Sequence, residues 1–137
     1  MFGSWSLKDM KKAISDGYLN HWFRKAVLAS FHYHCGICGL SWEVGSLEAH
    51  HIIKRRRKFT RWDWRNGIPL CKKCHALAHT KKGELFISRR HPYYADLVNM
   101  ECINFKDYLV AIGMTENEFR QRTLKELKEK VGELIEV

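Results

Sequence analysis

The stretch that decides the fold of this chain runs Glu48-Ala49-His50-His51-Ile52 and then, after a basic loop, Asn66-Gly67-Ile68-Pro69-Leu70-Cys71-Lys72-Lys73-Cys74-His75, with His79 following. One pair of cysteines separated by two residues lies inside it, and a second such pair lies just upstream. Cysteine pairs interleaved with a histidine doublet and two histidines four residues apart are typical of metal binding. The stretch therefore predicts a small fold built around bound metal.

The four paired cysteines predict a structural zinc site. Cys35, Cys38, Cys71 and Cys74 have the two-by-two spacing of a closed tetrahedral centre, which leaves no position for substrate. Zinc would join the first pair to the start of a short helix, because elements this small bury too little surface to hold together alone. The N-terminus does not resemble an export signal, so metal is favoured over disulfides. The fifth cysteine, Cys102, has apolar neighbours, and we expect it to be buried.

The histidines predict a second, separate metal site. Residues four apart on a helix share a face while neighbours diverge, so His75 and His79 would face away from Cys74. Neighbours on a strand also point apart, so one member of the His50-His51 doublet can complete a three-histidine site while the other acts on substrate. A histidine suits proton transfer near neutral pH. Without the doublet, a solvated helix face would explain His75 and His79 equally well.

Positive charge surrounds these ligands. The 137-residue chain has a net charge of +9, but residues 52–90 carry 13 Lys or Arg against Asp63 and Glu84, a local net of +11. A charge run alone is more often a solvated loop, but beside metal ligands it favours a protein that contacts phosphates. Trp62 and Trp64 are candidates for stacking on bases, although Trp64 fits the core better. The candidate DNA-binding residues are Lys54, Arg55, Arg56, Arg57, Lys58 and Arg61.

The expected core is a strand, a second strand and a helix. Strands over 47–53 and 67–70 would form a hairpin whose loop carries most of the charge. A helix over 71–81 would follow, closed by Gly83. Asn66 would hydrogen-bond across the hairpin and hold either the loop or the proton-accepting histidine in place, although an isolated Asn-Gly is most simply a turn.

Helices are expected on both sides of this core. The patterns place them over 6–15, ended by Asp16-Gly17; over 20–31; in two parts within 93–112; and over 114–137, opened by a capping box of Thr115 and Glu118. The last helix would pack on the core or mediate self-association. We expect one α+β domain over 1–137, with a catalytic and zinc core at about 20–82 and a helical extension at about 93–137. No apolar run is long enough to predict a membrane span.

Three sites in this pattern resemble the HNH endonuclease family, also called ββα-metal nucleases, in the branch with a four-cysteine zinc site. They are His51 in His50-His51-Ile52, Asn66 in Asn66-Gly67-Ile68-Pro69-Leu70-Cys71, and His75 in Cys74-His75. The resemblance covers about residues 20–82 and implies a treble-clef-like core and metal-dependent hydrolysis of DNA phosphodiester bonds, by nicking or double-strand cleavage. It implies that His51 is the general base, that Asn66 orients it, and that His50, His75 and His79 bind the catalytic metal.

The chain departs from the family at the metal ligands. Many members have Asp where this chain has His50, and Asn or Lys where it has His79. A three-histidine site leaves the catalytic ion open among Mg²⁺, Mn²⁺, Zn²⁺, Ni²⁺ and Co²⁺, beside the structural Zn²⁺. One arginine among residues 55–61 would stabilise the transition state, and the sequence does not choose among them.

The resemblance implies DNA as the partner and a phage or bacterial setting, in the cytoplasm of a bacterial host cell. Members act in homing, restriction and phage DNA packaging, so a packaging or other DNA-processing partner is compatible, with a monomer or weak dimer as the oligomeric state. Two alternatives remain. One is a non-catalytic, zinc-stabilised nucleic-acid-binding module. The other is a protein-interaction zinc finger, which the local charge disfavours.

Overall fold

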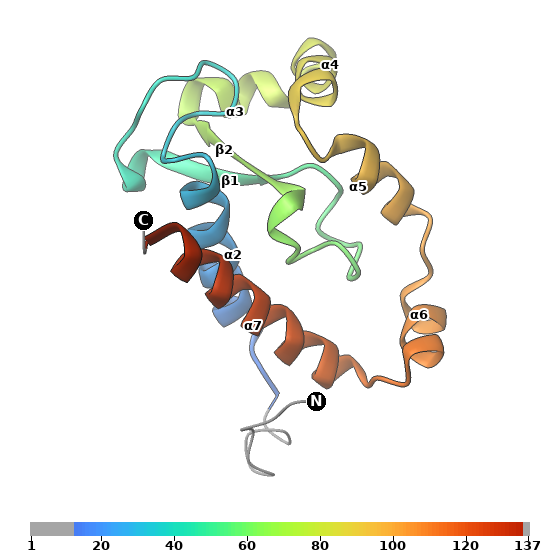
Figure 1. The fold of residues 1–137 in the computed structure, drawn as a ribbon. Helices are drawn as coiled ribbons and strands as arrows, with labels where there is room; N and C mark the ends of the chain where they lie inside the picture. Colours follow the sequence, from blue (N-terminus) through green and yellow to red (C-terminus); the bar gives the residue numbers. More distant parts are fainter. Residues whose placement is uncertain (1–12, 136–137) are drawn as a thin grey trace.

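An antiparallel hairpin lies at the centre of the computed structural model, which describes residues 13–135 (Figure 1). Strand β1 (Leu47–His51) pairs with β2 (Gly67–Cys71), from Leu47 opposite Cys71 to His51 opposite Gly67. The helices and short 3-10 segments are α2 (Asp16–Ser30), η1 (Val44–Ser46), η2 (Trp64–Asn66), α3 (Lys72–Ala78), α4 (Lys81–Arg90), α5 (Tyr94–Glu101), α6 (Phe105–Ile112) and α7 (Glu116–Ile135). The order β1, β2, α3 confirms the expected α+β class with a small ββα core.

Helix α2 is the packing centre of the molecule. Its apolar stripe includes Leu19, Phe23 and Val27, each at most 2% exposed. These side chains share one core with Leu70 of the hairpin and Leu127 of α7, and α2 and α7 lie side by side in Figure 1. Burying a side chain of this size contributes roughly 1.5–3 kcal/mol to the stability of the fold. Because these side chains contact both the hairpin and α7, α2 holds the two together.

The N-terminal boundary of α2 differs from the expectation. Most of the helix expected over 6–15 lies outside the described residues, but the expectation that Asp16-Gly17 ends a helix is wrong. These residues begin α2, because the Ser15 hydroxyl accepts a hydrogen bond from the backbone N–H of Tyr18 at 3.1 Å and Asp16 places a negative charge in the first turn. The helix expected over 20–31 therefore starts at Asp16.

Helix α3 is shorter than expected, and Gly83 does not close it. It ends at Ala78 with His79 as its C-cap. Thr80 then caps the next helix, because its hydroxyl accepts a hydrogen bond from the backbone N–H of Gly83 at 3.1 Å. Gly83 thus lies in the first turn of α4.

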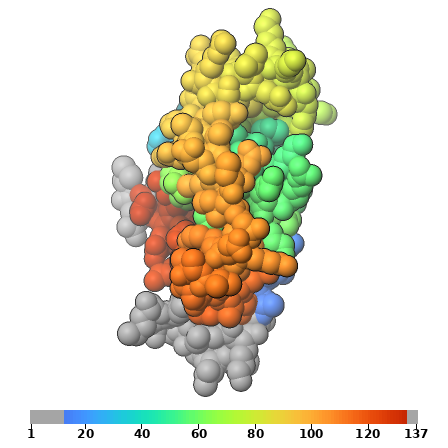
Figure 2. All heavy atoms as spheres, turned by 90° about the vertical axis from the view of Figure 1, so that its right-hand side faces the viewer, coloured from blue at the N-terminus to red at the C-terminus, as the bar shows by residue number. Residues whose placement is uncertain are grey.

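The C-terminal part of the chain runs down one side of the molecule, through α5 and α6, before α7 returns to the core (Figures 1 and 2). The expected capping box is confirmed: Glu118 N–H donates to the Thr115 hydroxyl at 3.1 Å, and Thr115 N–H donates to the Glu118 carboxylate at 3.2 Å. The expected burial of Cys102 is wrong. This residue is the C-cap of α5 and is exposed to solvent. None of the helices within 13–135 is long and apolar enough to cross a membrane.

Candidate functional site

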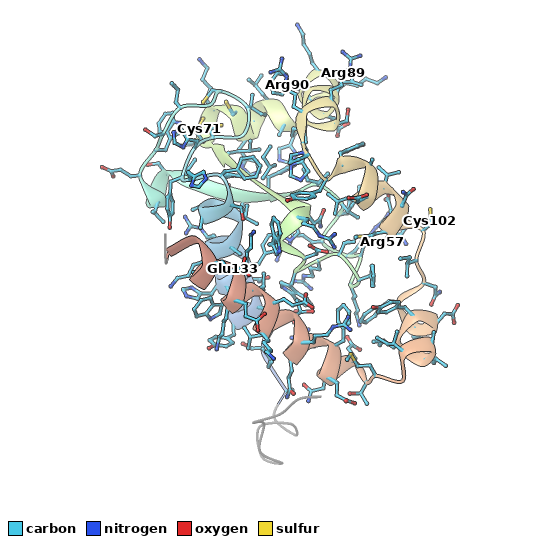
Figure 3. All side chains as sticks on the ribbon, in the orientation of Figure 1. Arg57, Cys71, Arg89, Arg90, Cys102 and Glu133 are labelled. Carbon is cyan, nitrogen blue, oxygen red and sulfur yellow. The ribbon has the colours of Figure 1, made fainter. Side chains whose placement is uncertain are left out.

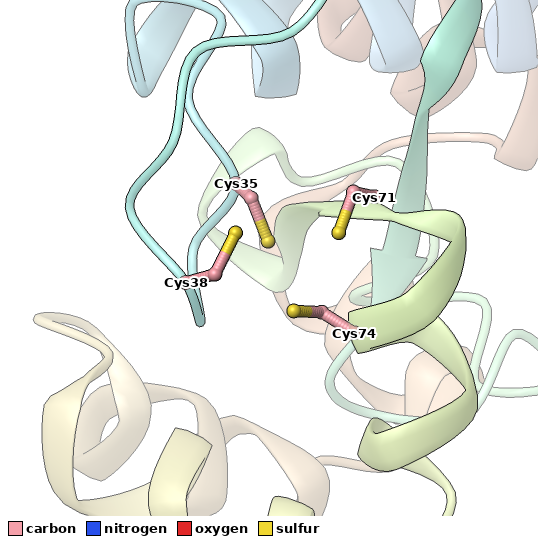
Figure 4. A group of neighbouring side chains, drawn as sticks. All are labelled: Cys35, Cys38, Cys71 and Cys74. Atoms are coloured by element: carbon pink, nitrogen blue, oxygen red, sulfur yellow. The ribbon is translucent and has the colours of Figure 1, made fainter.

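Four cysteine side chains converge from three parts of the chain (Figure 4). Cys35 and Cys38 lie on the turn after α2, Cys71 ends β2, and Cys74 lies in the first turn of α3. Their sulfur atoms all lie within 4.8 Å of one another. Tetrahedral zinc–thiolate coordination requires sulfurs about 3.8 Å apart, which a small contraction would give. The cysteine cluster can therefore hold a metal ion, as predicted.

The turn that carries the first pair is held against β2 by a close backbone approach at Gly36. Gly36 N–H donates to the Pro69 carbonyl at 2.7 Å, and a Cβ at this position would lie 2.3 Å from two carbons of Ile68. Glycine is therefore required here by packing against β2. The contact brings Cys35 and Cys38 to the cysteines of β2 and α3.

The thiols of the cluster oppose one another's ionisation. Burial disfavours the Cys35 thiolate, but backbone N–H groups of Cys71, Cys38 and Ile37 more than compensate and lower its pKa to about 7. Burial, contacts with neighbouring thiols and the charge at Cys35 raise the pKa of Cys74. Four crowded thiols thus cannot all ionise without a cation among them, and a divalent ion supplies that positive charge.

The second cluster consists of His50 on β1 with His75 and His79 at the end of α3. One ring nitrogen of each lies within 4.8 Å of those of the other two. The structure thus places Cys74 in the sulfur cluster and its neighbour His75 in the imidazole cluster. Burial, followed by the neighbouring histidine charges, lowers the pKa of His50 to about 4. His50 is therefore a neutral imidazole near neutral pH, the form that binds metal.

Glu48 contacts this cluster, although it is not among the candidate site residues that the sequence predicts. Its carboxylate lies 2.7 Å from Nδ1 of His75. Because side chains two apart on a strand share a face, Glu48 and His50 both reach α3 from β1. A carboxylate on one ring nitrogen fixes the imidazole so that the other nitrogen faces a metal. An acidic residue two positions before a candidate ligand on a strand is the signal that could have identified it.

His51 lies outside the three-histidine cluster and is held by two contacts. Its ring stacks on Phe23 at 4.5 Å between centroids, and its Nε2 lies 2.8 Å from the Arg61 carbonyl oxygen. A carbonyl only accepts hydrogen bonds, so Nε2 carries the hydrogen and Nδ1 keeps its lone pair. Burial, with the charges of Arg55 and Arg61, lowers the pKa of His51 to about 4 against the raising effect of the carbonyl. Near neutral pH the ring is therefore unprotonated at Nδ1.

Asn66 is fully buried and closes the loop between the strands. Its Oδ1 accepts from Ile53 N–H at 2.6 Å, and its Nδ2 donates to the carbonyls of Ile53 at 3.1 Å and Thr60 at 3.0 Å. Within residues 13–135, the Asn66 side chain forms no hydrogen bond with His51. Instead it fixes Thr60, next to Arg61, whose carbonyl holds the His51 ring. Asn66 therefore positions His51 through the loop.

A cleft of about 990 Å³ brings both groups of histidines together. It is lined by His50, His51, His75 and His79, and by Lys54 and Arg55 of the basic loop. An open cleft of this size, with imidazoles and cations on its walls, can admit a phosphate group. The four histidines that the sequence singled out thus share one cleft.

The six candidate DNA-binding residues have different surroundings. Lys54 and Arg55 line the cleft, whereas Arg56, Arg57 and Lys58 line a separate groove of about 480 Å³. Lys58 pairs with Glu116 at 3.1 Å. Arg61 pairs with Asp16 at 3.4 Å and lies over the Trp62 ring.

Trp62 and Trp64, the two tryptophans considered for stacking on bases, do not offer exposed ring surfaces. Trp62 is 4% exposed and donates from its indole nitrogen to Asn20 at 2.8 Å, so the suggestion that it stacks on bases is wrong. Trp64 is partly buried against the core, as the sequence suggested, and Lys130 covers its ring.

The fold is a ββα domain with two separate clusters, one of cysteines and one of histidines, each of which could hold a metal ion. The family model described as HNH endonuclease matches residues 35–81, from the first cysteine pair to the start of α4. The match covers 47 of the 137 residues, and it points to the same family that the sequence pattern resembles. Neither the curated proteins nor the solved structures include a significant match to the chain.

Proposed function

We propose that this protein is a metal-dependent DNA endonuclease that hydrolyses phosphodiester bonds, by nicking or double-strand cleavage, with His51 as general base. The observation that carries the proposal is the division of the histidine doublet. His50 joins His75 and His79, whereas His51 lies apart with a free Nδ1, and all four line one cleft. Only one of two adjacent strand residues can face the ligand cluster, so the other is left for chemistry on substrate.

His51 takes a proton from the attacking water at Nδ1. Its hydrogen bond to the Arg61 carbonyl stabilises the imidazolium that forms, and the stack on Phe23 keeps the ring in place. Because the pKa of His51 is well below neutrality, the ring is available as a base in nearly every molecule at pH 7. Asn66 is a positioning residue, since it holds the loop segment that carries this carbonyl.

The three-histidine cluster fits a divalent ion. His50, His75 and His79 would hold it, with Glu48 orienting His75. The ion would supply positive charge at the leaving oxygen, on the side opposite the attack. Imidazole ligands suit Zn²⁺, Ni²⁺, Co²⁺ and Mn²⁺, and Mg²⁺ remains the hard-metal candidate. We propose structural zinc for the cysteine cluster, where four thiolates leave no open position.

Arg55 is the arginine best placed to stabilise negative charge on the scissile phosphate. It lines the cleft, is exposed, and has no ion-pair partner among the described residues. Its charge lowers the pKa of His51, which places it near the base. Arg61 is engaged with Asp16, and Arg56 and Arg57 border the other groove.

The packing of α7 against α2 in one core supports a single domain over the chain, with the catalytic and zinc core at about 20–82 and the helical extension at about 93–137. We propose that it works as a monomer or weak dimer in the cytoplasm of a bacterial host cell. A phage packaging or other DNA-processing partner fits the nuclease function.

Plasmid cleavage tests the proposal. Wild type would be treated with chelator until one zinc per chain remains, and each divalent metal would then be added singly. Nicking or linearisation should return with at least one metal in wild type and in His34→Ala, an exposed histidine outside the cleft, but not in His75→Ala. Binding of plasmid without cleavage under any metal would favour the non-catalytic nucleic-acid-binding module instead.

A further inference from the structure

Unpaired positive charge is concentrated on α3 and α4. Six exposed cations lie on these two helices, and none of them forms an ion pair within residues 13–135. Glu84 is the single acidic residue over residues 72–90. The cations, called here the α3–α4 cationic surface, are Lys72, Lys73, Lys81, Lys82, Arg89 and Arg90, and Figure 3 labels the last two near the end of α4.

The cations of α7 have a different environment. Arg120 pairs with Asp16, and Arg122, Lys125 and Lys130 pair with glutamates one turn along the same helix. Charge on α7 is therefore largely neutralised within the protein. On α3 and α4 the six charges repel one another in the free protein, so a polyanion that binds there relieves repulsion and releases its own counterions.

The α3–α4 cationic surface is held rigidly against the metal-binding histidines. Helix α3 carries His75 and His79, and Gly83 of α4 packs so closely on α3 that an added Cβ would lie 1.9 Å from the Leu77 carbonyl oxygen. Helix α4 also lines the cleft through Glu84. Figure 1 shows α4 above the hairpin and the basic loop descending below it. Cations thus flank the cleft on two sides.

We propose that the α3–α4 cationic surface is a second DNA-binding surface, which holds the phosphate backbone on the side of the cleft away from the basic loop. The proposal rests on the proposed nuclease function for the orientation of the DNA, but not for binding itself. Phosphates are its ligands because six exposed Lys and Arg with one acidic residue among them offer positive charge and carry no base-reading geometry. Binding there is therefore independent of DNA sequence and steeply dependent on salt.

The test compares two double variants with equal loss of charge. Lys81→Gln/Lys82→Gln neutralises the proposed surface, and Lys125→Gln/Lys128→Gln neutralises two exposed cations of α7. Both are made in the full chain with His51→Ala to prevent cleavage, and zinc content and melting temperature confirm folding. The affinity for a short DNA duplex is measured as a function of KCl concentration.

The first variant should weaken binding equally for unrelated DNA sequences. It should also flatten the plot of log affinity against log salt by up to about 2, because each lost phosphate contact removes about 0.9 from the slope. The α7 variant should retain the slope of the parent protein. Equal slopes in the two variants would overturn the proposal. Weaker binding of polyglutamate with unchanged DNA binding would also overturn it and indicate an acidic protein partner.

Cleavage by the same lysine variants with His51 intact separates this proposal from the nuclease function. Lys81→Gln/Lys82→Gln should raise KM and leave kcat unchanged. If wild type binds DNA through Lys81 and Lys82 but fails to cleave it with any of the metals, the proposed nuclease function is refuted and the proposed DNA-binding surface stands. If wild type cleaves DNA and the Lys81→Gln/Lys82→Gln variant has the same KM, the proposed nuclease function stands and the proposed DNA-binding surface is refuted.

Discussion

At the scale of single residues, the structure separates side chains that look equivalent in the sequence. His50 and His51 are neighbours of one type, yet one faces two histidines of α3 and the other faces a backbone carbonyl. Arg55 and Arg56 are likewise adjacent, but only Arg55 lines the histidine cleft. The division follows from strand alternation for the histidines and from the course of the loop for the arginines.

The two adjacent arginines give a matched comparison. Arg55→Ala should lower kcat by roughly 10²–10³, the usual cost of removing one donor to developing charge in a closed site. Arg56→Ala removes the same charge from the other groove and should leave kcat within a few fold of wild type. Single-turnover cleavage of a labelled duplex, with metal and DNA both saturating, measures the difference. Equal losses in the two variants would remove Arg55 from the catalytic site.

Glu48 tests how the metal ligands are oriented. Glu48→Gln should weaken binding of the catalytic ion by roughly 10–100-fold, the usual effect of losing the carboxylate behind a ligating histidine. Cleavage should then recover as metal is added in excess. Titration of Mn²⁺ or Co²⁺ by calorimetry gives the affinity. The same change at Glu43, an exposed acid before β1, is the control and should leave the affinity unaltered.

At the scale of elements, the junction between α3 and α4 depends on one glycine. Gly83→Ala should destabilise the fold by about 1–3 kcal/mol, because its Cβ meets the Leu77 carbonyl and the two helices must separate. Gly132→Ala in α7 is the control, since its Cβ meets nothing within 4 Å. That change should stabilise the fold by up to about 1 kcal/mol through helix propensity. Urea denaturation measures the free energy of unfolding of both variants. An unchanged value for Gly83→Ala would show that α3 and α4 can separate at Gly83 without cost.

The elements also mark where sequence reasoning succeeded and failed. Spacing alone located the hairpin and the division of Cys74 and His75 between two clusters, because side chains that converge in this way need fixed positions on regular elements. It misplaced the end of α3, since Gly83 is required by contact with Leu77, and a glycine needed for packing looks the same as one needed for a turn. It also missed Glu48, whose contact with His75 joins residues from different elements.

At the scale of the whole molecule, the cysteine cluster and the three-histidine cluster draw on different faces of one short helix, α3. Cys74 and His75 belong to different clusters although they are adjacent. The burial of Trp62 against α2 and the choice among the arginines were beyond prediction, because both depend on long-range packing around α2. The composition could indicate phosphate as the partner. Which cations are left without an acidic partner could be learned only from the ion pairs in the structure.

The separation of the two clusters predicts independent metal losses. His75→Ala should remain folded and keep one zinc per chain while losing the second ion. Cys71→Ser should lose the fold, because the zinc that joins β2 and α3 to the cysteine turn would lose a buried ligand. Metal analysis together with circular dichroism distinguishes these outcomes. A folded Cys71→Ser protein with full activity would contradict a structural role for the cysteine cluster.

The most direct test of the account is single-turnover DNA cleavage by His51→Ala in protein shown to bind the same metal content as wild type. The proposed mechanism uses His51 for proton transfer and only its neighbour His50 for metal binding. It therefore predicts unchanged metal content, nearly unchanged DNA affinity, and a cleavage rate lower by roughly 10²–10⁴-fold, the range for loss of a general base. A cleavage rate within a few fold of wild type at full metal content would contradict it.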